Sequence, residues 1–134
     1  MPSPALWMQA VLLSSDLMLM SVAQGAADRH GVAVVAAGDV DRAVELSGED
    51  GTRLVVVDLR LPELDMADLV ARVRGAKPRA AVVACGPHVH TQSLAAATAA
   101  GCDAVFTRGE FERRIDGLFA AITGPEASAD AARP

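Results

Sequence analysis

The stretch LVVVDLRLPELD, residues 54–65, decides the fold of this chain. Four apolar residues run directly into Asp58, and Pro62 follows four positions later. A short apolar run without polar alternation is typical of a parallel strand that is buried on both faces. Asp58 therefore ends a predicted buried strand, and two interpretations are open: it is a nucleophile at the strand end, or only the first polar residue after the strand.

Similar apolar runs recur along the chain and alternate with longer amphipathic stretches. The predicted strands are Met8–Leu13, Val32–Ala36, Leu54–Val57, Ala80–Ala84 and Ala104–Thr107. The predicted helices are Asp16–Arg29, Val40–Leu46, Met66–Gly75, Thr91–Ala100 and Phe111–Ile122. This alternation with short connections predicts a doubly wound α/β fold with one parallel sheet and right-handed crossovers.

Capping residues mark several of these boundaries. Asp16 and Asp39 stand at the N-cap positions of the first two helices, where a carboxylate accepts hydrogen bonds from free backbone N–H groups. Gly31 and Gly48 follow the same helices as candidate C-caps, and Pro78 is a stop signal after the third helix.

The composition fits one compact domain with an aliphatic core. The chain has 134 residues, of which 51% are apolar and 3% aromatic, and its formal net charge is −5. The negative charge and the scarcity of aromatic side chains argue against a nucleic-acid partner. Two cysteines, Cys85 and Cys102, do not make a disulfide framework, and we expect reduced, buried thiols.

We expect the domain to span residues 1–124, with its core at about 8–122 and a flexible tail at 125–134. The N-terminal apolar run has no basic segment before it, is interrupted by Gln9 and is too short to cross a bilayer. We therefore expect a cytoplasmic protein that does not act on a membrane.

In an open parallel sheet, ligands bind outside the carboxyl ends of the strands, so the residues that follow each strand form the candidate site. These residues are Ser14, Ser15 and Asp16 after the first strand, Asp58 after the third, Cys85 and Gly86 after the fourth, and Arg108 after the fifth. Carboxylate, small and cationic side chains would therefore share one edge of the sheet.

The order of elements, the length and two motifs, VVVDLRLP at 55–62 and AAGCDAVFTRGEF at 99–111, resemble the chemotaxis-type receiver domain of response regulators in two-component signalling. The resemblance covers roughly residues 8–122 and implies a flavodoxin-like (βα)5 fold with strand order 2-1-3-4-5. In that family an aspartate at the position of Asp58 accepts a phosphoryl group from a histidine kinase, and a proline like Pro62 follows it. A basic residue, here Arg108, contacts the phosphoryl group. The resemblance implies a phosphorelay protein that is not an enzyme beyond its own phosphorylation.

The sequence also departs from the receiver pattern around this site. The departures are Ser14 and Ser15 in place of an acidic pair, with Asp16 one position late; Cys85 or Gly86 in place of a hydroxyl-bearing switch residue; and Gly109 in place of a proline after the basic residue. In the family, the acidic pair organises Mg²⁺.

The replaced acidic pair bears directly on the chemistry. Phosphoryl transfer to a carboxylate needs the charge of the transferred group to be neutralised. Mg²⁺ prefers carboxylate and carbonyl oxygens, and hydroxyls are poor substitutes, so we expect weak Mg²⁺ binding at best. Two interpretations follow: Asp58 is phosphorylated at an unusual site, or the chain is a phosphorylation-independent pseudo-receiver in which Asp58 is a structural residue paired with Arg108.

The resemblance further implies protein partners. These would be a histidine kinase, a downstream effector, or a second copy bound through the face that the fourth helix, fifth strand and fifth helix form. Phe106, Phe111, Arg113 and Arg114 fall on or near that face. For the two phenylalanines, packing in the core is the alternative.

Two other kinds of site are weaker alternatives. The segment CGPHVH places Cys85, His88 and His90 close together in the chain, and zinc uses such side chains. A flavin- or nucleotide-binding module of flavodoxin type would use Ser14 and Ser15 to hold a phosphate. However, no glycine-rich turn follows the first strand, and the later loops lack aromatic residues to flank a flavin ring.

Overall fold

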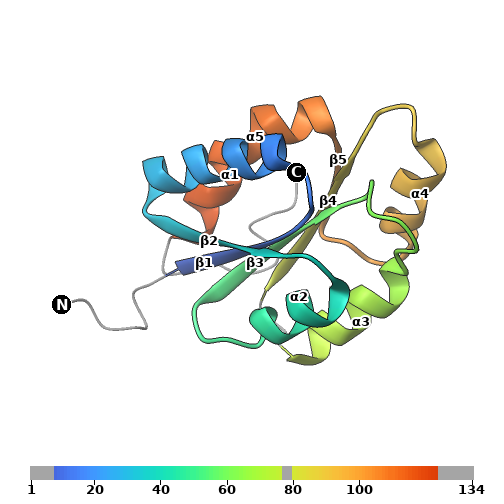
Figure 1. Ribbon diagram of the computed structural model, residues 1–134, viewed down its shortest axis with the longest axis horizontal. Coiled ribbons are helices and arrows are strands. Elements are labelled where there is room, and N and C mark those ends of the chain that lie inside the picture. The colour runs from blue at the N-terminus through green and yellow to red at the C-terminus, as the bar shows by residue number, and fades with distance from the viewer. Residues whose placement is uncertain (1–7, 77–79, 124–134) are drawn as a thin grey trace.

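The computed structural model describes residues 8–76 and 80–123, and within them strands and helices alternate strictly (Figure 1). The strands are β1 (Met8–Leu13), β2 (Val32–Ala37), β3 (Thr52–Asp58), β4 (Ala81–Gly86) and β5 (Ala104–Thr107). The helices are α1 (Leu17–His30), α2 (Val40–Ser47), α3 (Met66–Ala76), α4 (Thr91–Ala99) and α5 (Arg108–Ile122). Every predicted strand and helix is present, while the predicted stop signal Pro78 and the predicted tail lie outside the described residues.

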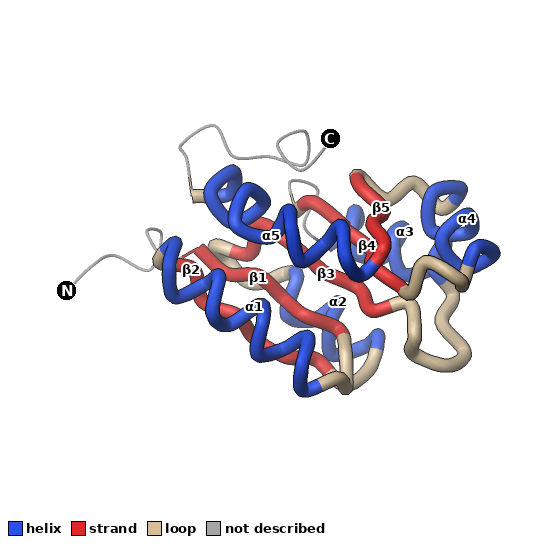
Figure 2. Tube along the Cα trace, turned by 90° about the horizontal axis from the view of Figure 1, so that it is seen from above, coloured by secondary structure: helices blue, strands red, loops and turns tan. Residues whose placement is uncertain are grey.

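The sheet has five strands in the order β2-β1-β3-β4-β5, and all of its pairings are parallel. This arrangement confirms the predicted doubly wound fold and its strand order. Figure 2 shows the strands as a central layer, with α1 and α5 together on one face. Because all strands run in the same direction, their carboxyl ends meet at one edge.

Two apolar layers hold the helices on the sheet. The layer under α1 and α5 contains the large side chains Leu19, Phe111 and Phe119, and the layer under α2, α3 and α4 is aliphatic. The exposed fraction of Phe106 is 4% and that of Phe111 is 0%, so both side chains pack in the core and neither forms the predicted partner face. β5 places Phe106 toward the same layer as α5, which explains its burial.

The predicted helix start at Phe111 is wrong by one turn, because a capping box begins α5 at Arg108. The Thr107 hydroxyl accepts a hydrogen bond from the Glu110 N–H at 3.2 Å, and the Glu110 carboxylate accepts one from the Thr107 N–H at 2.8 Å. Arg108 is therefore the first residue of a helix rather than the residue that ends a strand.

The capping predictions for α1 and α2 are largely confirmed. Asp16 and Asp39 each accept hydrogen bonds from N–H groups of the first turn that follows. Gly31 ends α1 in the left-handed conformation, with φ of 67°, which a residue with a side chain adopts only at a cost. Gly48 caps α2 with ordinary right-handed angles, so its position does not require glycine.

Candidate functional site

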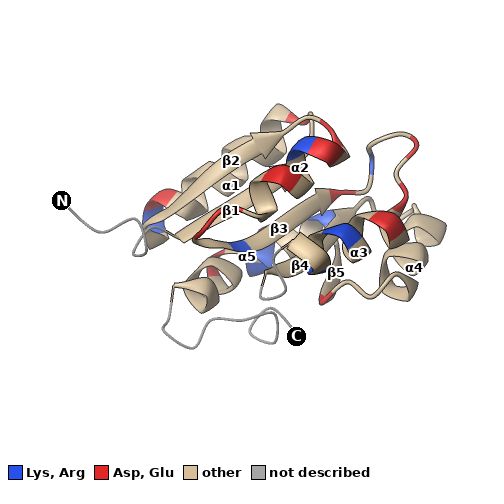
Figure 3. Cartoon of the chain, turned by 90° about the horizontal axis from the view of Figure 1, so that it is seen from below, with Lys and Arg blue, Asp and Glu red and all other residues tan. Residues whose placement is uncertain are grey.

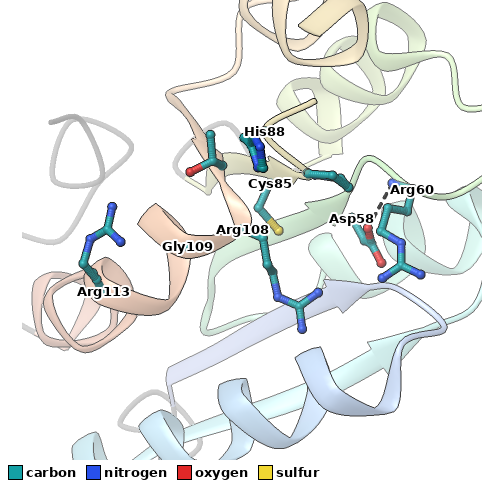
Figure 4. A pocket seen from close by; sticks show the side chains of 10 residues that line it. Asp58, Arg60, Cys85, His88, Arg108, Gly109 and Arg113 are labelled. Atoms are coloured by element: carbon teal, nitrogen blue, oxygen red, sulfur yellow. Dashed lines mark hydrogen bonds between the residues drawn. The ribbon is translucent and has the colours of Figure 1, made fainter. Parts of the chain in front are cut away.

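The candidate site lies at the carboxyl edge of the sheet, around Asp58. Asp58 is the last residue of β3 and pairs in register with Cys85 of β4, while Ser14 follows β1 directly. The exposed fraction of Asp58 is 4%, and Figure 4 shows its side chain beside that of Arg60. The parallel topology thus brings together the strand-end residues that the sequence predicted.

Both carboxylate oxygens of Asp58 already accept hydrogen bonds. The Ser14 hydroxyl donates to Oδ2 at 2.7 Å, and the Arg60 backbone N–H donates to Oδ1 at 2.9 Å. Ser14 Oγ in turn accepts a hydrogen bond from the Asp16 N–H at 3.0 Å. Ser14 therefore holds the Asp58 carboxylate as a neutral donor, at the position where an acidic side chain would repel it unless a cation lay between them.

Asp16 forms the ion pairs of the site with two arginines. Its Oδ1 accepts hydrogen bonds from the N–H groups of Met18 and Leu19, at 2.8 and 3.3 Å. Its Oδ2 accepts one from Arg60 Nη1 at 2.9 Å and one from Arg108 Nη1 at 3.1 Å. The predicted pairing of Arg108 with Asp58 is thus wrong. Arg108 pairs with Asp16, while the oxygens of Asp58 accept from the Ser14 hydroxyl and the Arg60 backbone N–H.

The hydrogen bond from Arg108 is the largest cause that holds the pKa of the Asp16 carboxyl below its ordinary value of 3.8, and the N–H groups of Leu19 and Met18 lower it further. A carboxyl group whose pKa is lower in the folded state than in the unfolded chain stabilises the fold. This contribution is fully present at pH values above the pKa of the group in the unfolded chain. That contribution is lost as the pH falls through the lowered value. The ion pairs of Asp16 therefore support the fold near neutral pH and fail in acid.

We expect Asp16→Asn to lower the free energy of unfolding at about pH 7, and the difference from the wild type to shrink below about pH 4. Asparagine is also a good N-cap, so the variant removes the charge and spares the cap. Urea denaturation at both pH values measures the difference. Asp39→Asn is the matched control, because Asp39 caps α2 through the Arg42 N–H without a side-chain ion pair among the described residues. A difference for Asp16→Asn that does not change with pH would contradict the prediction.

The residues of the site are poor ligands for Mg²⁺. In the described part of the chain, no group of three or more histidine, cysteine, aspartate or glutamate side chains is placed to hold a metal ion. Asp58 is the one carboxylate at the end of β3, and Asp16 is bound to two arginines and to the first turn of α1. A hard dication would have to displace these guanidinium groups and would gain only serine hydroxyls in the acidic-pair positions.

The switch position offers no hydroxyl group. Gly86 ends β4, and a Cβ atom added to it would lie 3.0 Å from Cβ of Leu59, so a serine or threonine there would require Leu59 to shift. Its neighbour Cys85 is buried, and burial raises the pKa of the thiol to about 12, with the nearby Asp58 charge as a further cause. Cys85 is therefore a neutral, unreactive thiol at neutral pH.

Two cavities adjoin Asp58 and Arg60. One has a volume of about 430 Å³ and extends from Asp58 to the start of α5. The other, of about 580 Å³, extends from Asp58 to the start of α1. The sequence analysis did not single out Arg60, although its position two residues after Asp58 was a signal that could have found it.

The zinc and flavin alternatives gain no support from the geometry. His88 and His90 are exposed in the loop before α4, and they line different cavities. Cys85 is buried as a neutral thiol, whereas zinc binds the thiolate. No phenylalanine, tyrosine or tryptophan side chain lines either cavity beside Asp58 within the described residues, so a flavin ring would have none of these stacking partners there.

The exposed surface is mixed in charge, with large apolar side chains beside the site. Figure 3 shows acidic and basic residues interspersed on α2 and α3, where Arg72 pairs with Asp41 at 2.8 Å. The exposed fractions of Leu17 and Met18 are 84% and 70%, and both line the second cavity. No helix in the described ranges combines the length and the apolar character needed to cross a membrane.

This fold and site define a receiver-like α/β domain, in which Ser14 and Ser15 rather than acidic residues lie next to the strand-end aspartate. Among solved structures, the chain is similar to a CheY-like protein, TadZ, from Pseudomonas aeruginosa, with a TM-score of 0.67 and 22% identity over 90% of this chain and 97% of that one. It is also similar to the receiver domain of a sensor histidine kinase from the same organism, whose active-site cleft holds a magnesium ion, with a TM-score of 0.66, 17% identity and coverage of 84% and 98%.

A third similar structure is the receiver domain of a response regulator from Saccharomyces cerevisiae, crystallised with its histidine phosphotransfer signalling protein. Its TM-score is 0.68 and its identity 14%, over 92% of this chain and 96% of that one. No protein-family model and no curated relative matches the sequence. The predicted resemblance is therefore confirmed as a matter of fold: the chain has the receiver-domain fold with a divergent sequence.

Proposed function

We propose that the chain is a receiver-like signal-transduction domain that acts by contact with partner proteins and does not depend on phosphorylation of Asp58. The observation that carries this proposal is the 2.7 Å hydrogen bond from the Ser14 hydroxyl to Asp58 Oδ2. A serine donor stabilises the Asp58 carboxylate without a metal ion, so the site is complete as a structural hydrogen-bonded unit. The domain has no enzymatic role in this proposal.

Three further features support a phosphorylation-independent role. Arg108 is bound to Asp16, so it is not free to contact a phosphoryl group on Asp58. Gly86 supplies no hydroxyl to respond to such a group. Each oxygen of the Asp58 carboxylate accepts a hydrogen bond, and such bonds stabilise the carboxylate and make it a weaker nucleophile. Mg²⁺ binding, in this proposal, is weak.

The partner is a protein of a two-component pathway, such as a histidine kinase or a downstream effector, or a second copy of the chain. The exposed side chains of Leu17 and Met18, next to the Asp58 cavity, provide apolar area that a partner would cover. On the face of α4, β5 and α5, Arg113 is exposed and the Arg114 guanidinium lies 5.5 Å from the centre of the Phe106 ring. These charged side chains are the available contacts on that face, since Phe106 is buried beneath them.

Amide NMR with Mg²⁺, before and after addition of beryllofluoride, tests the proposal. Beryllofluoride mimics an acyl phosphate on a receptive aspartate, and we expect it to leave the spectrum unchanged. A receiver domain that has the acidic pair serves as the control for the reagent. Shifts centred on Asp58 that spread to Arg108 and α4 would overturn the proposal and establish a phosphorylation switch with an unusual site.

A further inference from the structure

The β2 edge of the sheet lacks the features that usually protect an exposed strand. β2 and β5 are the outer strands, at opposite edges of the strand layer in Figure 2. Edge strands are commonly short, or carry charges, proline or bulges that prevent pairing with another chain. β5 has four residues, and its last N–H, that of Thr107, donates to the Glu110 carboxylate. β2 has six residues, VAVVAA, all uncharged and paired with β1 in unbroken register.

One hydrogen bond shows which backbone groups of β2 point outward. The Ser14 N–H donates to the Ala37 carbonyl at 3.3 Å, so Ala37 is bonded to the β1 side. In a parallel pair, alternate residues of a strand direct their N–H and carbonyl groups to the same neighbour. Val35 therefore also faces β1, whereas Val34 and Ala36 direct their backbone groups away from the sheet. Within the described residues, these outward groups have no hydrogen-bond partner.

Half-buried apolar side chains lie on both faces of this edge. Met20 of α1 and Val34 pack against the core layer under α1 and α5, and Val35 packs against the opposite layer. Met20 is on the side of α1 that faces away from α5, because it is about two and a half turns from Arg29, which binds Asp116 of α5 at 2.9 Å. A strand added to β2 would therefore cover apolar side chains as well as pair with the backbone.

The geometry points to a dimer of two copies of this chain, joined by antiparallel pairing of their β2 strands into one continuous sheet. A twofold axis perpendicular to the sheet would place Val34 opposite Val34 of the other copy, and Val32 opposite Ala36. These are the outward-facing residues of the strand, so each outward N–H would meet a carbonyl in both copies. Parallel pairing would need an offset of one residue between the copies, which a twofold axis does not allow.

The charges beside the edge suit a second copy. β2 is uncharged, and α2, which packs against it, carries Arg42 and Glu45 as an ion pair. Two copies thus present opposite as well as like charges to each other, although each chain is acidic overall. One strand and its flanks make a small interface, so we expect a dissociation constant of about 10 μM to 1 mM. The dimer uses neither Asp58 nor its cavities, so it stands whether or not the proposed function is correct.

Sedimentation of the whole chain from about 10 μM to about 2 mM, with amide hydrogen exchange at both ends of that range, tests the dimer. We expect self-association, and exchange of the Val34 and Ala36 amides about fivefold slower at the higher concentration. The Val35 amide, bonded to β1, should exchange equally slowly at both. A chain that stays monomeric would overturn the inference. Slow exchange of Val34 and Ala36 at every concentration would also overturn it, because the chain would then cover its own edge.

Matched variants locate the interface. Ala36→Pro removes an outward N–H of an edge strand, where proline is tolerated, and Ala36→Lys adds a charge that protects natural edges. We expect each to weaken the dimer at least about tenfold, since the change occurs twice per dimer, and to keep a native-like amide spectrum. Ala67→Lys, at an exposed alanine of α3, is the control and should stay within about twofold. If Ala95→Lys on α4 weakens association and Ala36→Lys does not, the dimer forms through α4, β5 and α5, and the inference is overturned.

Discussion

Replacing Ser14 by aspartate is expected to lower the free energy of unfolding by about 2–4 kcal/mol in EDTA, and Mg²⁺ is expected to restore much of the loss. The Ser14 hydroxyl now donates to Asp58 Oδ2 at 2.7 Å. Ser14→Asp would put two carboxylates into contact at a position where Ser14 is 9% exposed. Like charges at such a short distance repel strongly where water is excluded. A dication between them would convert that repulsion into binding.

Urea denaturation with EDTA and with millimolar Mg²⁺ measures both parts of this prediction. Ser14→Asn is the matched control, because asparagine is similar in size to aspartate and adds no charge. We expect its stability, like that of the wild type, to be the same with and without Mg²⁺. If Ser14→Asp is as stable as Ser14→Asn in EDTA, the side chain does not lie against Asp58. If Mg²⁺ stabilises the wild type as much as Ser14→Asp, the serine site binds the metal after all.

The strands and the position of Asp58 could be predicted because their signals are local. Buried parallel strands appear as continuous apolar runs, and parallel topology forces the residues that follow them to one edge. Asp16 and Asp39 could be identified as N-caps for the same reason, since a cap acts on N–H groups two or three residues away.

The pairing of charges at the site could not be predicted, because it depends on which of several nearby carboxylates each arginine reaches. Arg108 and Asp16 are 92 residues apart in the sequence, and Ser14 and Asp58 are 44 apart. The topology brings these four residues to one edge of the sheet. The direction of each side chain then decides that Ser14 donates a hydrogen bond to Asp58 and that Arg108 donates one to Asp16.

One error, in contrast, had a local signal that went unused. The sequence TRGE, residues 107–110, has the capping-box spacing of a threonine followed three residues later by glutamate. The predicted start at Phe111 followed the apolar stripe of the helix instead. A hydrophobic stripe marks the face that packs on the sheet and can begin a turn after the helix does, so capping residues fix the start more accurately.

The corrected start of α5 makes Phe111 the fourth residue of the helix, and we expect Phe111→Ala to lower the free energy of unfolding by about 3–5 kcal/mol. The exposed fraction of Phe111 is 0%, and the side chain belongs to the core layer that includes Ile115 and Phe119. Truncation removes transfer free energy and leaves a cavity that the surrounding core fills only in part. Because domains are stable by only about 5–15 kcal/mol, the variant would be close to unfolding.

Two measurements distinguish a core residue from a residue of the partner face. Urea denaturation gives the stability of Phe111→Ala, and sedimentation compares the self-association of the variant with that of the wild type. Phe111→Leu is the control, because it stays apolar and should cost much less than Phe111→Ala. A decrease in the free energy of unfolding of less than about 1 kcal/mol for Phe111→Ala, accompanied by weaker self-association, would contradict the burial of Phe111. It would place this residue on the predicted partner face.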